Sequence, residues 1–225
     1  MSQSTIEQLS QLISQYKHNN RAIDSVMDIQ FNTTTKGRMG YGNYKIQQLE
    51  EENKKIETAV ASILTTQYSQ NPHSQQMQDI SKLLIDNQAY DFVTQLANIK
   101  LAHQDMTNMP ELVTSLAISP STINLSSLIS SYPSVMPIVS QVKDTTTSAD
   151  VLTHLGYLTT RDKNHEQVNV FSIDHLAERI SSLNDIYAIK QFTDHHLENI
   201  SPKMREHLKG QFDALKAKMD DIPSM

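Results

Sequence analysis

Two segments near the start of the chain carry matching heptad patterns, and this match constrains the fold more than any other feature. Apolar side chains recur at intervals of three and four residues from position 6 to 30, and again from 46 to 67. That spacing places them along one seam of a helix. The pattern predicts a first helix over about 5–31 and a second over about 44–68.

Each seam contains one asparagine, Asn20 in the first helix and Asn53 in the second, almost equally far from the midpoint of the stretch between them. Folding the chain back at that midpoint brings the two amides to similar heights, where each can satisfy the other's hydrogen bonds. This symmetry predicts an antiparallel helical hairpin with arms of roughly 40 Å. The alternative is a pair of coiled-coil segments that dimerise with a second copy, because a seam asparagine also fixes the register of a dimer.

The stretch between the helices, residues 33–43, contains three of the chain's five glycines. Glycine permits the positive φ values of a reversing chain, so we predict that this stretch is the hairpin tip. It lacks the preceding strand and the ending of a nucleotide-binding loop. The tip is either a plain turn or a contact site for protein or nucleic acid, because residues 33–45 contain three cations and two tyrosines but no acid. These candidate binding residues are Lys36, Arg38, Tyr41, Tyr44 and Lys45.

Composition excludes several classes of function. The net charge of -6 at pH 7 provides no general attraction to nucleic acid or anionic lipid. The chain has no cysteine, which excludes disulfides, thiolate metal sites and cysteine nucleophiles. No secretory signal pattern is visible, and no apolar run approaches the roughly 18 residues of a membrane span. We therefore expect a cytoplasmic protein, or one exported without a cleaved signal peptide, with no stable transmembrane span.

The middle of the chain is apolar and poor in charge. Asn71 and Pro72 predict the start of a buried helix that runs to about Gln104. No lysine or arginine occurs in residues 101–142, and prolines divide this segment into short helices. Charge depletion favours a buried core or a subunit interface. Insertion of residues 112–139 into a membrane, as in helical pore-forming toxins, is an alternative.

A further alternative is a winged-helix unit. Residues 110–131 read as a helix, a turn and a helix, and residues 148–173 read as a capped helix followed by a strand pair. Together they resemble a winged-helix unit over 110–173. The helix that would read bases, 121–131, carries no cation, so the resemblance favours protein contact over DNA binding. Three residues of the turn suit a phosphate backbone: Arg161, Lys163 and His165.

Two amphipathic helices are expected near the end of the chain. The first spans about 174–199, with Tyr187 on its apolar stripe. The second begins at Pro202, and its exposed side is basic, which is typical of a solvated face and less often of a site for an anionic partner. The predicted apolar face of this last helix comprises Met204, Leu208, Phe212, Leu215 and Met219.

The sequence shows no recognisable catalytic set. The nine histidines are densest in TDHHLEN, where Asp194, His195 and Glu198 are weak candidates for a metal site. Only His195 and Glu198 have the spacing of a helical ligand pair. No zincin motif, nucleophile elbow or kinase set occurs. We therefore predict a protein without enzymatic activity and without a cofactor.

These observations predict a mainly α protein with an N-terminal antiparallel helical hairpin packed with a helical bundle, and one small β-hairpin near residues 156–173. Three regions are expected, either as separate domains or as one continuous domain. They are the long helical hairpin (1–70), the central helix with the charge-poor short helices (71–145) and a helical region with the β-hairpin (146–225). The favoured function is protein interaction or assembly through helical surfaces, as in a structural subunit, an adaptor or a secreted effector, with a protein partner or self-association. The alternatives are nucleic-acid binding through the hairpin tip and the winged-helix-like segment, and membrane insertion.

Overall fold

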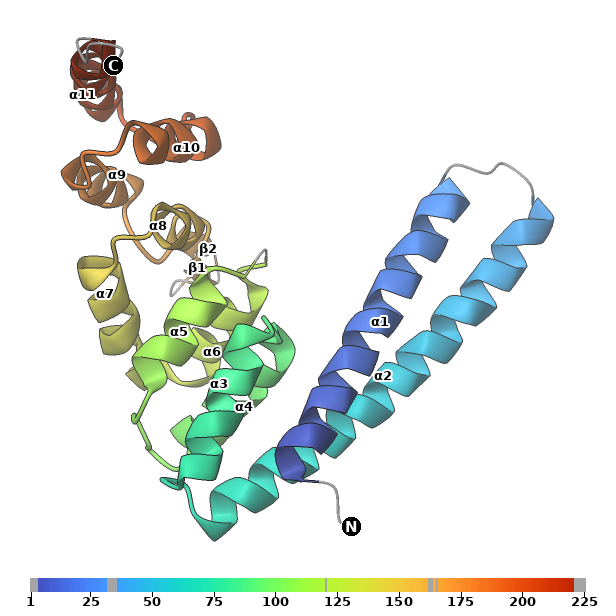
Figure 1. Cartoon of the computed structure of the whole chain (residues 1–225). Coiled ribbons are helices and arrows are strands. Elements are labelled where there is room, and N and C mark those ends of the chain that lie inside the picture. The colour runs from blue at the N-terminus through green and yellow to red at the C-terminus, as the bar shows by residue number, and fades with distance from the viewer. Residues whose placement is uncertain (1–3, 32–35, 120, 162–163, 165, 221–225) are drawn as a thin grey trace. The chain divides into compact units, whose positions relative to one another are not determined.

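The computed structural model describes residues 4–31, 36–119, 121–161, 164 and 166–220 (Figure 1). Its contacts divide the chain into two compact units, residues 1–100 and 101–225. The described residues are mainly α-helical, with a two-stranded antiparallel sheet in the second unit. The predicted fold class is confirmed. The predicted division into three parts stays a prediction.

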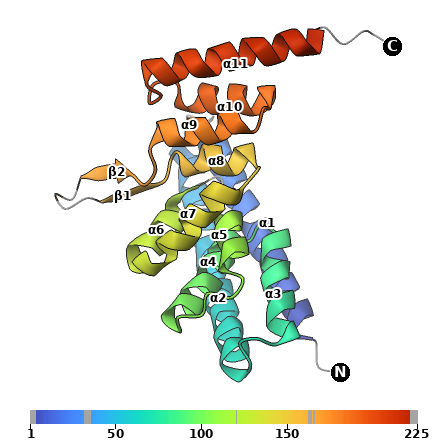
Figure 2. The same cartoon turned by 90° about the vertical axis from the view of Figure 1, so that its left-hand side faces the viewer.

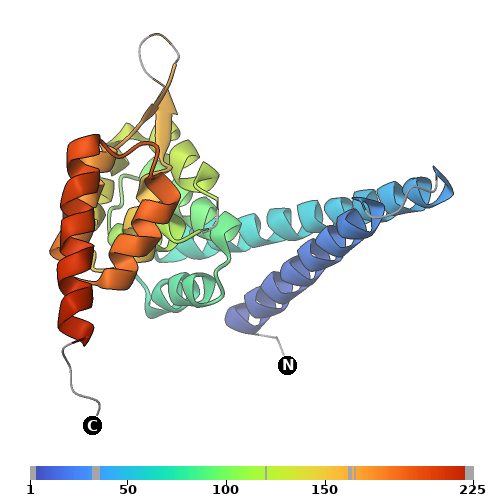
Figure 3. The same ribbon diagram turned by 90° about the horizontal axis from the view of Figure 1, so that it is seen from above.

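Unit 1 is built on the predicted helical hairpin. Helices α1 and α2 lie side by side and run in opposite directions (Figures 1 and 3). α1 has the predicted bounds, and α3 packs against it. Buried side chains of all four helices, including Leu9, Ile56, Leu84 and Phe92, form the core. The helices are α1 (Thr5–Phe31), α2 (Lys36–Gln70), α3 (Gln75–Asp86) and α4 (Tyr90–Ala102).

The seam asparagines Asn20 and Asn53 form the predicted hydrogen bond, and Asn19 also bonds to Asn53. Asn53 Nδ2 donates to Asn20 Oδ1 over 2.6 Å, and Asn19 Nδ2 donates to Asn53 Oδ1 over 3.0 Å. Asn19 and Asn53 are only 3% and 7% exposed, whereas Asn20 is half-buried. One amide of α2 therefore bonds with two consecutive amides of α1, and this three-residue network aligns the two arms.

Tyr16 joins three helices of unit 1. Its hydroxyl lies 2.9 Å from Asp91 Oδ2 on α4 and 3.1 Å from Glu57 Oε1 on α2. Its ring packs against Phe92, with 4.9 Å between ring centroids. Burial raises the pKa of the Tyr16 hydroxyl, and the two carboxylates raise it further. The neutral phenol is therefore the form that the folded unit favours.

The prediction that glycines form the hairpin turn is wrong. α2 begins at Lys36, so Gly37, Gly40 and Gly42 lie within the helix. The connection between α1 and α2, residues 32–35, lies outside the described residues. A helical glycine costs about 1 kcal/mol relative to alanine. Each residue added to an existing helix also gains a hydrogen bond, so a helix as long as α2 can continue through these positions.

The predicted helix over 71–104 is interrupted. α3 begins after Ser74, whose hydroxyl accepts from Met77 N, so the cap is Ser74 and not Asn71. α3 ends in a Schellman motif, in which Gln88 has a φ of 51°. Its amide bonds to Ile85 O, and the Ala89 amide bonds to Leu84 O. These bonds satisfy the last carbonyls of α3 and redirect the chain into α4.

Unit 2 is a helical bundle that carries the predicted β-hairpin. α5 packs against α6, α7 and α8, and the charge-poor segment supplies buried core residues such as Leu112, Leu128 and Val139. In the described part of the chain, no helix combines the length and the apolar character that crossing a membrane requires. The elements are α5 (Met109–Ala117), α6 (Ile123–Ser131), the 3-10 helix η1 (Pro133–Val135), α7 (Met136–Thr145), α8 (Ala149–Leu155), β1 (Thr159–Arg161), β2 (Gln167–Asn169), α9 (Ile173–Ser182), α10 (Ile186–His196) and α11 (Pro202–Asp220).

The end of unit 2 is layered, with α8, α9, α10 and α11 packed in succession (Figure 2). The single helix predicted over 174–199 is wrong, because Asn184 has a φ of 51° and Asp185 caps a new helix, α10. Tyr187 is consequently 74% exposed instead of buried. α11 begins at Pro202 as predicted, after the Ser201 cap. Leu208 is the buried residue of its inner face, whereas Met219 is exposed.

Candidate functional site

The predicted hairpin tip is described only in part. The side chains of Lys36, Arg38 and Tyr41 lie outside the described residues. Tyr44 and Lys45 are exposed on the first turns of α2, and the Tyr44 hydroxyl accepts from Gln48 Nε2 over 2.9 Å. Contact of this tip with protein or nucleic acid stays a prediction.

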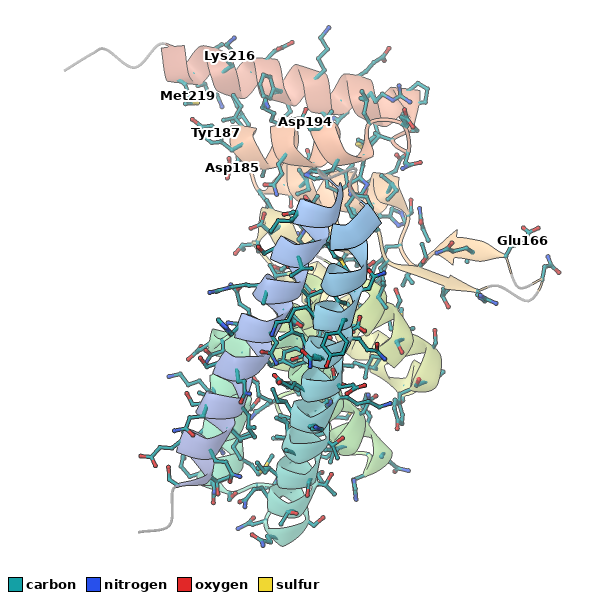
Figure 4. All side chains as sticks on the ribbon, turned by 90° about the vertical axis from the view of Figure 1, so that its right-hand side faces the viewer. Glu166, Asp185, Tyr187, Asp194, Lys216 and Met219 are labelled. Carbon is teal, nitrogen blue, oxygen red and sulfur yellow. The ribbon has the colours of Figure 1, made fainter. Side chains whose placement is uncertain are left out.

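The weak metal candidates do not form a ligand set. Asp194 pairs with Lys190 over 3.0 Å, and His195 Nδ1 lies 2.9 Å from the Tyr157 hydroxyl. Figure 4 shows Asp194 on α10, and Glu198 follows in the turn after that helix ends. Helical spacing therefore does not apply to His195 and Glu198. Among the residues that the structure describes, no three histidine, aspartate or glutamate side chains are placed to hold a metal ion.

His196, rather than its neighbour, is the buried histidine of this region. It is 1% exposed, and its Nε2 donates to Thr153 O over 2.8 Å. Burial lowers the pKa of His196, and the bond to Thr153 offsets this effect in part. A Cβ at Gly156 would lie 2.6 Å from two ring atoms of His196, so glycine is needed there for close packing. The pair joins α8 to α10 and has a structural role.

A pocket of about 1060 Å³ lies in unit 2. One wall is the β-hairpin, and the other is formed by the end of α6, η1 and the start of α7. Figures 2 and 3 show this hairpin extending from the helices. In Figure 4, Glu166 marks its far end. The apolar lining consists of Ile129, Pro133, Met136 and Val170.

Four hairpin residues that line the pocket share one face of the sheet, and Thr160 of the opposite face lines the pocket as well. Thr159 pairs with Asn169, and Arg161 pairs with Gln167. Paired residues of antiparallel strands lie on the same face, and residues two apart share it. All four line the pocket, and Gln167 Nε2 donates to Thr159 Oγ1 over 2.7 Å along this face. The wall is therefore polar, opposite an apolar floor.

Arg161 gives the pocket its charge. Among the ten described residues that line it, Arg161 alone is charged at neutral pH. No carboxylate of the described residues forms an ion pair with it, and its side chain is exposed. An exposed cation in the lining of a pocket favours an anionic group on a ligand.

The chemistry of the lining suits binding more than catalysis. Ser130 is a possible nucleophile, but its hydroxyl donates to Ser126 O over 2.9 Å. Among the lining residues that the structure describes, no histidine, aspartate, glutamate or lysine could serve as its base. Hydroxyl and amide groups beside apolar side chains are the usual contents of a recognition pocket.

The pocket was not predicted from the sequence, because it combines residues 129–136 with residues 159–170. Only the alternation around the turn indicated a hairpin with two different faces. The helix predicted to read bases in the winged-helix resemblance corresponds to α6, which has no charged residue. Nucleic-acid binding by this segment stays a prediction. Comparison with models of protein families, with curated proteins and with solved structures finds no match to this chain.

Proposed function

We propose that this chain is a non-enzymatic protein that binds another polypeptide, with the pocket of unit 2 as the docking site. The observation that carries this proposal is the lining, whose described residues join an apolar floor to a polar wall and include no nucleophile with a base. Protein recognition sites combine apolar contact with a limited number of hydrogen bonds in this way. A volume of about 1060 Å³ accommodates several side chains of a partner.

The rest of the chain supports a role as a scaffold for this site. The pocket walls are attached to a packed core, since Leu128 and Val135 beside the pocket are buried. Such anchoring keeps a binding surface in one shape before the partner arrives, which reduces the entropy lost on binding. An adaptor, a structural subunit and an effector would all use a site of this type.

The test is a selection of peptides from a displayed random library against the full chain. The chain has no cysteine, so one introduced cysteine can carry a bulky maleimide label at a chosen position. Ser130→Cys places the label in the pocket. Ser127→Cys places the same label on an exposed residue of the same helix that does not line the pocket, and serves as the matched control.

We expect selected peptides to bind the unlabelled chain and the labelled Ser127→Cys variant with equal affinity. Labelled Ser130→Cys should lose at least about tenfold in affinity, because the label occupies space that the peptide needs. A selection that returns no binding peptide would contradict the proposal. Equal binding to the two labelled variants would also contradict it, by moving the contact away from the pocket.

A further inference from the structure

The β-hairpin offers main-chain hydrogen bonds as well as side chains. Val170 N donates to Leu158 O over 2.8 Å, so these two residues form a hydrogen-bonded pair of the antiparallel ladder. Such pairs alternate with pairs that exchange no bonds. Thr160 and Val168 are therefore the next bonded pair. The main-chain N–H and C=O groups of Gln167 and Asn169 consequently point away from β1, along the outer edge of β2.

The two edges of this sheet differ. α6 packs against β1, whose Thr159 and Thr160 are only partly exposed. All three residues of β2, by contrast, are exposed. An exposed strand edge with free N–H and C=O groups can pair with a further strand. Because Gln167 and Asn169 also line the pocket, this edge and the pocket form one continuous surface.

We infer that the pocket takes an extended peptide segment that pairs with β2 as a third strand and places an acidic side chain near Arg161. The inference rests on the proposed function and specifies the conformation and charge of the partner. Strand pairing brings alternate side chains of the added segment to the face shared by Gln167 and Asn169. Those side chains enter the pocket, over the apolar floor of Ile129 and Met136.

Charge and shape favour this occupant over a helix. The main-chain groups of a docked helix bond within that helix, and only its side chains contact the partner. A docked helix would therefore leave the N–H and C=O groups along the β2 edge unpaired. An extended segment uses the edge and the pocket together. Its carboxylate would meet Arg161, the charged residue among the described pocket residues, and a guanidinium can bind a carboxylate through two hydrogen bonds.

The first test is N-methylation of the peptides that the selection returns. Methylation removes one main-chain N–H at a time, and only every second N–H of an added strand faces β2. Methylation at one set of alternate positions should weaken binding by at least about tenfold, and at the other set by less than about threefold. Uniform loss or uniform tolerance along the peptide would overturn the added strand. A helical peptide with contact residues three or four apart would overturn it as well.

The second test concerns the charge. Arg161→Gln should weaken the binding of a selected acidic peptide by about tenfold, and should scarcely change the binding of the same peptide with glutamine in place of its acid. Lys209→Gln removes one charge from an exposed residue of α11 and is the matched control, for which we expect no change. Equal effects of Arg161→Gln on the two peptides would overturn the assignment of the acidic partner.

These outcomes are distinct from those that test the proposed function. Peptides that are blocked by the label on Ser130→Cys, but show neither alternation nor dependence on Arg161, would leave the docking site in place and remove the added acidic strand. A single-stranded oligonucleotide that displaces the peptides through Arg161 would also overturn the inference, because the anionic group would then be a phosphate.

Discussion

The two hairpins of the chain differ in whether their polar side chains are buried within the fold or exposed. In the helical hairpin of unit 1, the amides of Asn19, Asn20 and Asn53 turn inward and bond with one another. In the β-hairpin of unit 2, Arg161 and Asn169 turn toward a pocket, and the edge of β2 faces solvent. Polar groups that are buried and satisfied specify alignment, whereas exposed polar groups remain available to a partner.

This contrast distinguishes polar groups that stabilise the fold from polar groups that are available to bind a partner. In a sequence, an asparagine in a heptad seam and a cluster of histidines can each be interpreted as a functional site. In both places buried groups bond within the same unit: Asn19 with Asn53 in the seam, and His196 Nε2 with Thr153 O, although His196 Nδ1 has no hydrogen-bond partner among the described residues. The pocket wall differs because its groups are exposed at a concave surface. Substitutions should therefore affect stability at the first kind of site and binding at the second.

Asn53→Ala should produce the largest loss of stability. It removes the hydrogen-bond partner that both α1 amides share, and it leaves Asn19 buried with only its longer bond of 3.4 Å to Glu52 Oε2. The loss of buried amide hydrogen bonds costs about 1 to 3 kcal/mol, so we expect the free energy of unfolding to fall by about 2 kcal/mol. Urea unfolding of the full chain, followed by circular dichroism, measures this change.

The matched control for this prediction is Gln47→Ala, which removes an exposed amide from the same helix. It should change the free energy of unfolding by less than about 0.5 kcal/mol. If the two variants were equally stable, the seam amides would not hold the arms together, and the contrast between the two hairpins would fail.

Tyr16→Phe should have a smaller effect. The variant keeps the ring contact with Phe92 and loses the hydroxyl that bonds to Asp91 or Glu57. The loss of one such hydrogen bond to a charged acceptor is worth about 1 kcal/mol near neutral pH. Urea unfolding of wild type and variant at pH 7 measures the difference. Tyr187→Phe, on a residue that is 74% exposed, is the control and should change little.

The pH dependence of stability gives this prediction a second test. The folded unit raises the pKa of Tyr16 above its ordinary value, mainly through burial and then through Asp91 and Glu57. The hydroxyl therefore loses its proton more readily in the unfolded chain. Its stabilising contribution is complete below about pH 10 and declines as the pH rises further. Wild type should lose stability above pH 10 more steeply than Tyr16→Phe, and parallel pH profiles would contradict this.

The sequence predicted those parts of the fold that depend on periodicity. The heptad seam predicted α1 at its observed bounds and the alignment of Asn20 with Asn53. It did not predict that α2 extends through Gly37, Gly40 and Gly42, because glycine is typical of turns and is unfavourable within a helix. It also missed the breaks at Gln88 and Asn184, since neither glycine nor proline marks them.

The sequence predicted less of the candidate site than of the fold. The β-hairpin around Arg161 was predicted, but the pocket also needs Ile129 and Met136 from a segment that was predicted to be a buried core or a subunit interface. Which face of a hairpin meets a helix depends on packing between segments that are distant along the chain. The importance of Gly156 likewise becomes visible only when the ring of His196 is placed against it.

Removing the side-chain amides of Gln167 and Asn169 should change the free energy of unfolding least. In Gln167→Ala with Asn169→Ala, two exposed side chains are lost, and with them the bond from Gln167 to Thr159. Water replaces that bond, so the free energy of unfolding should fall by less than about 0.5 kcal/mol. Binding of selected peptides should nevertheless weaken severalfold, because the wall loses two hydrogen-bonding groups. A stability loss as large as that of Asn53→Ala, with unchanged peptide affinity measured by calorimetry, would reverse the roles assigned to the two hairpins.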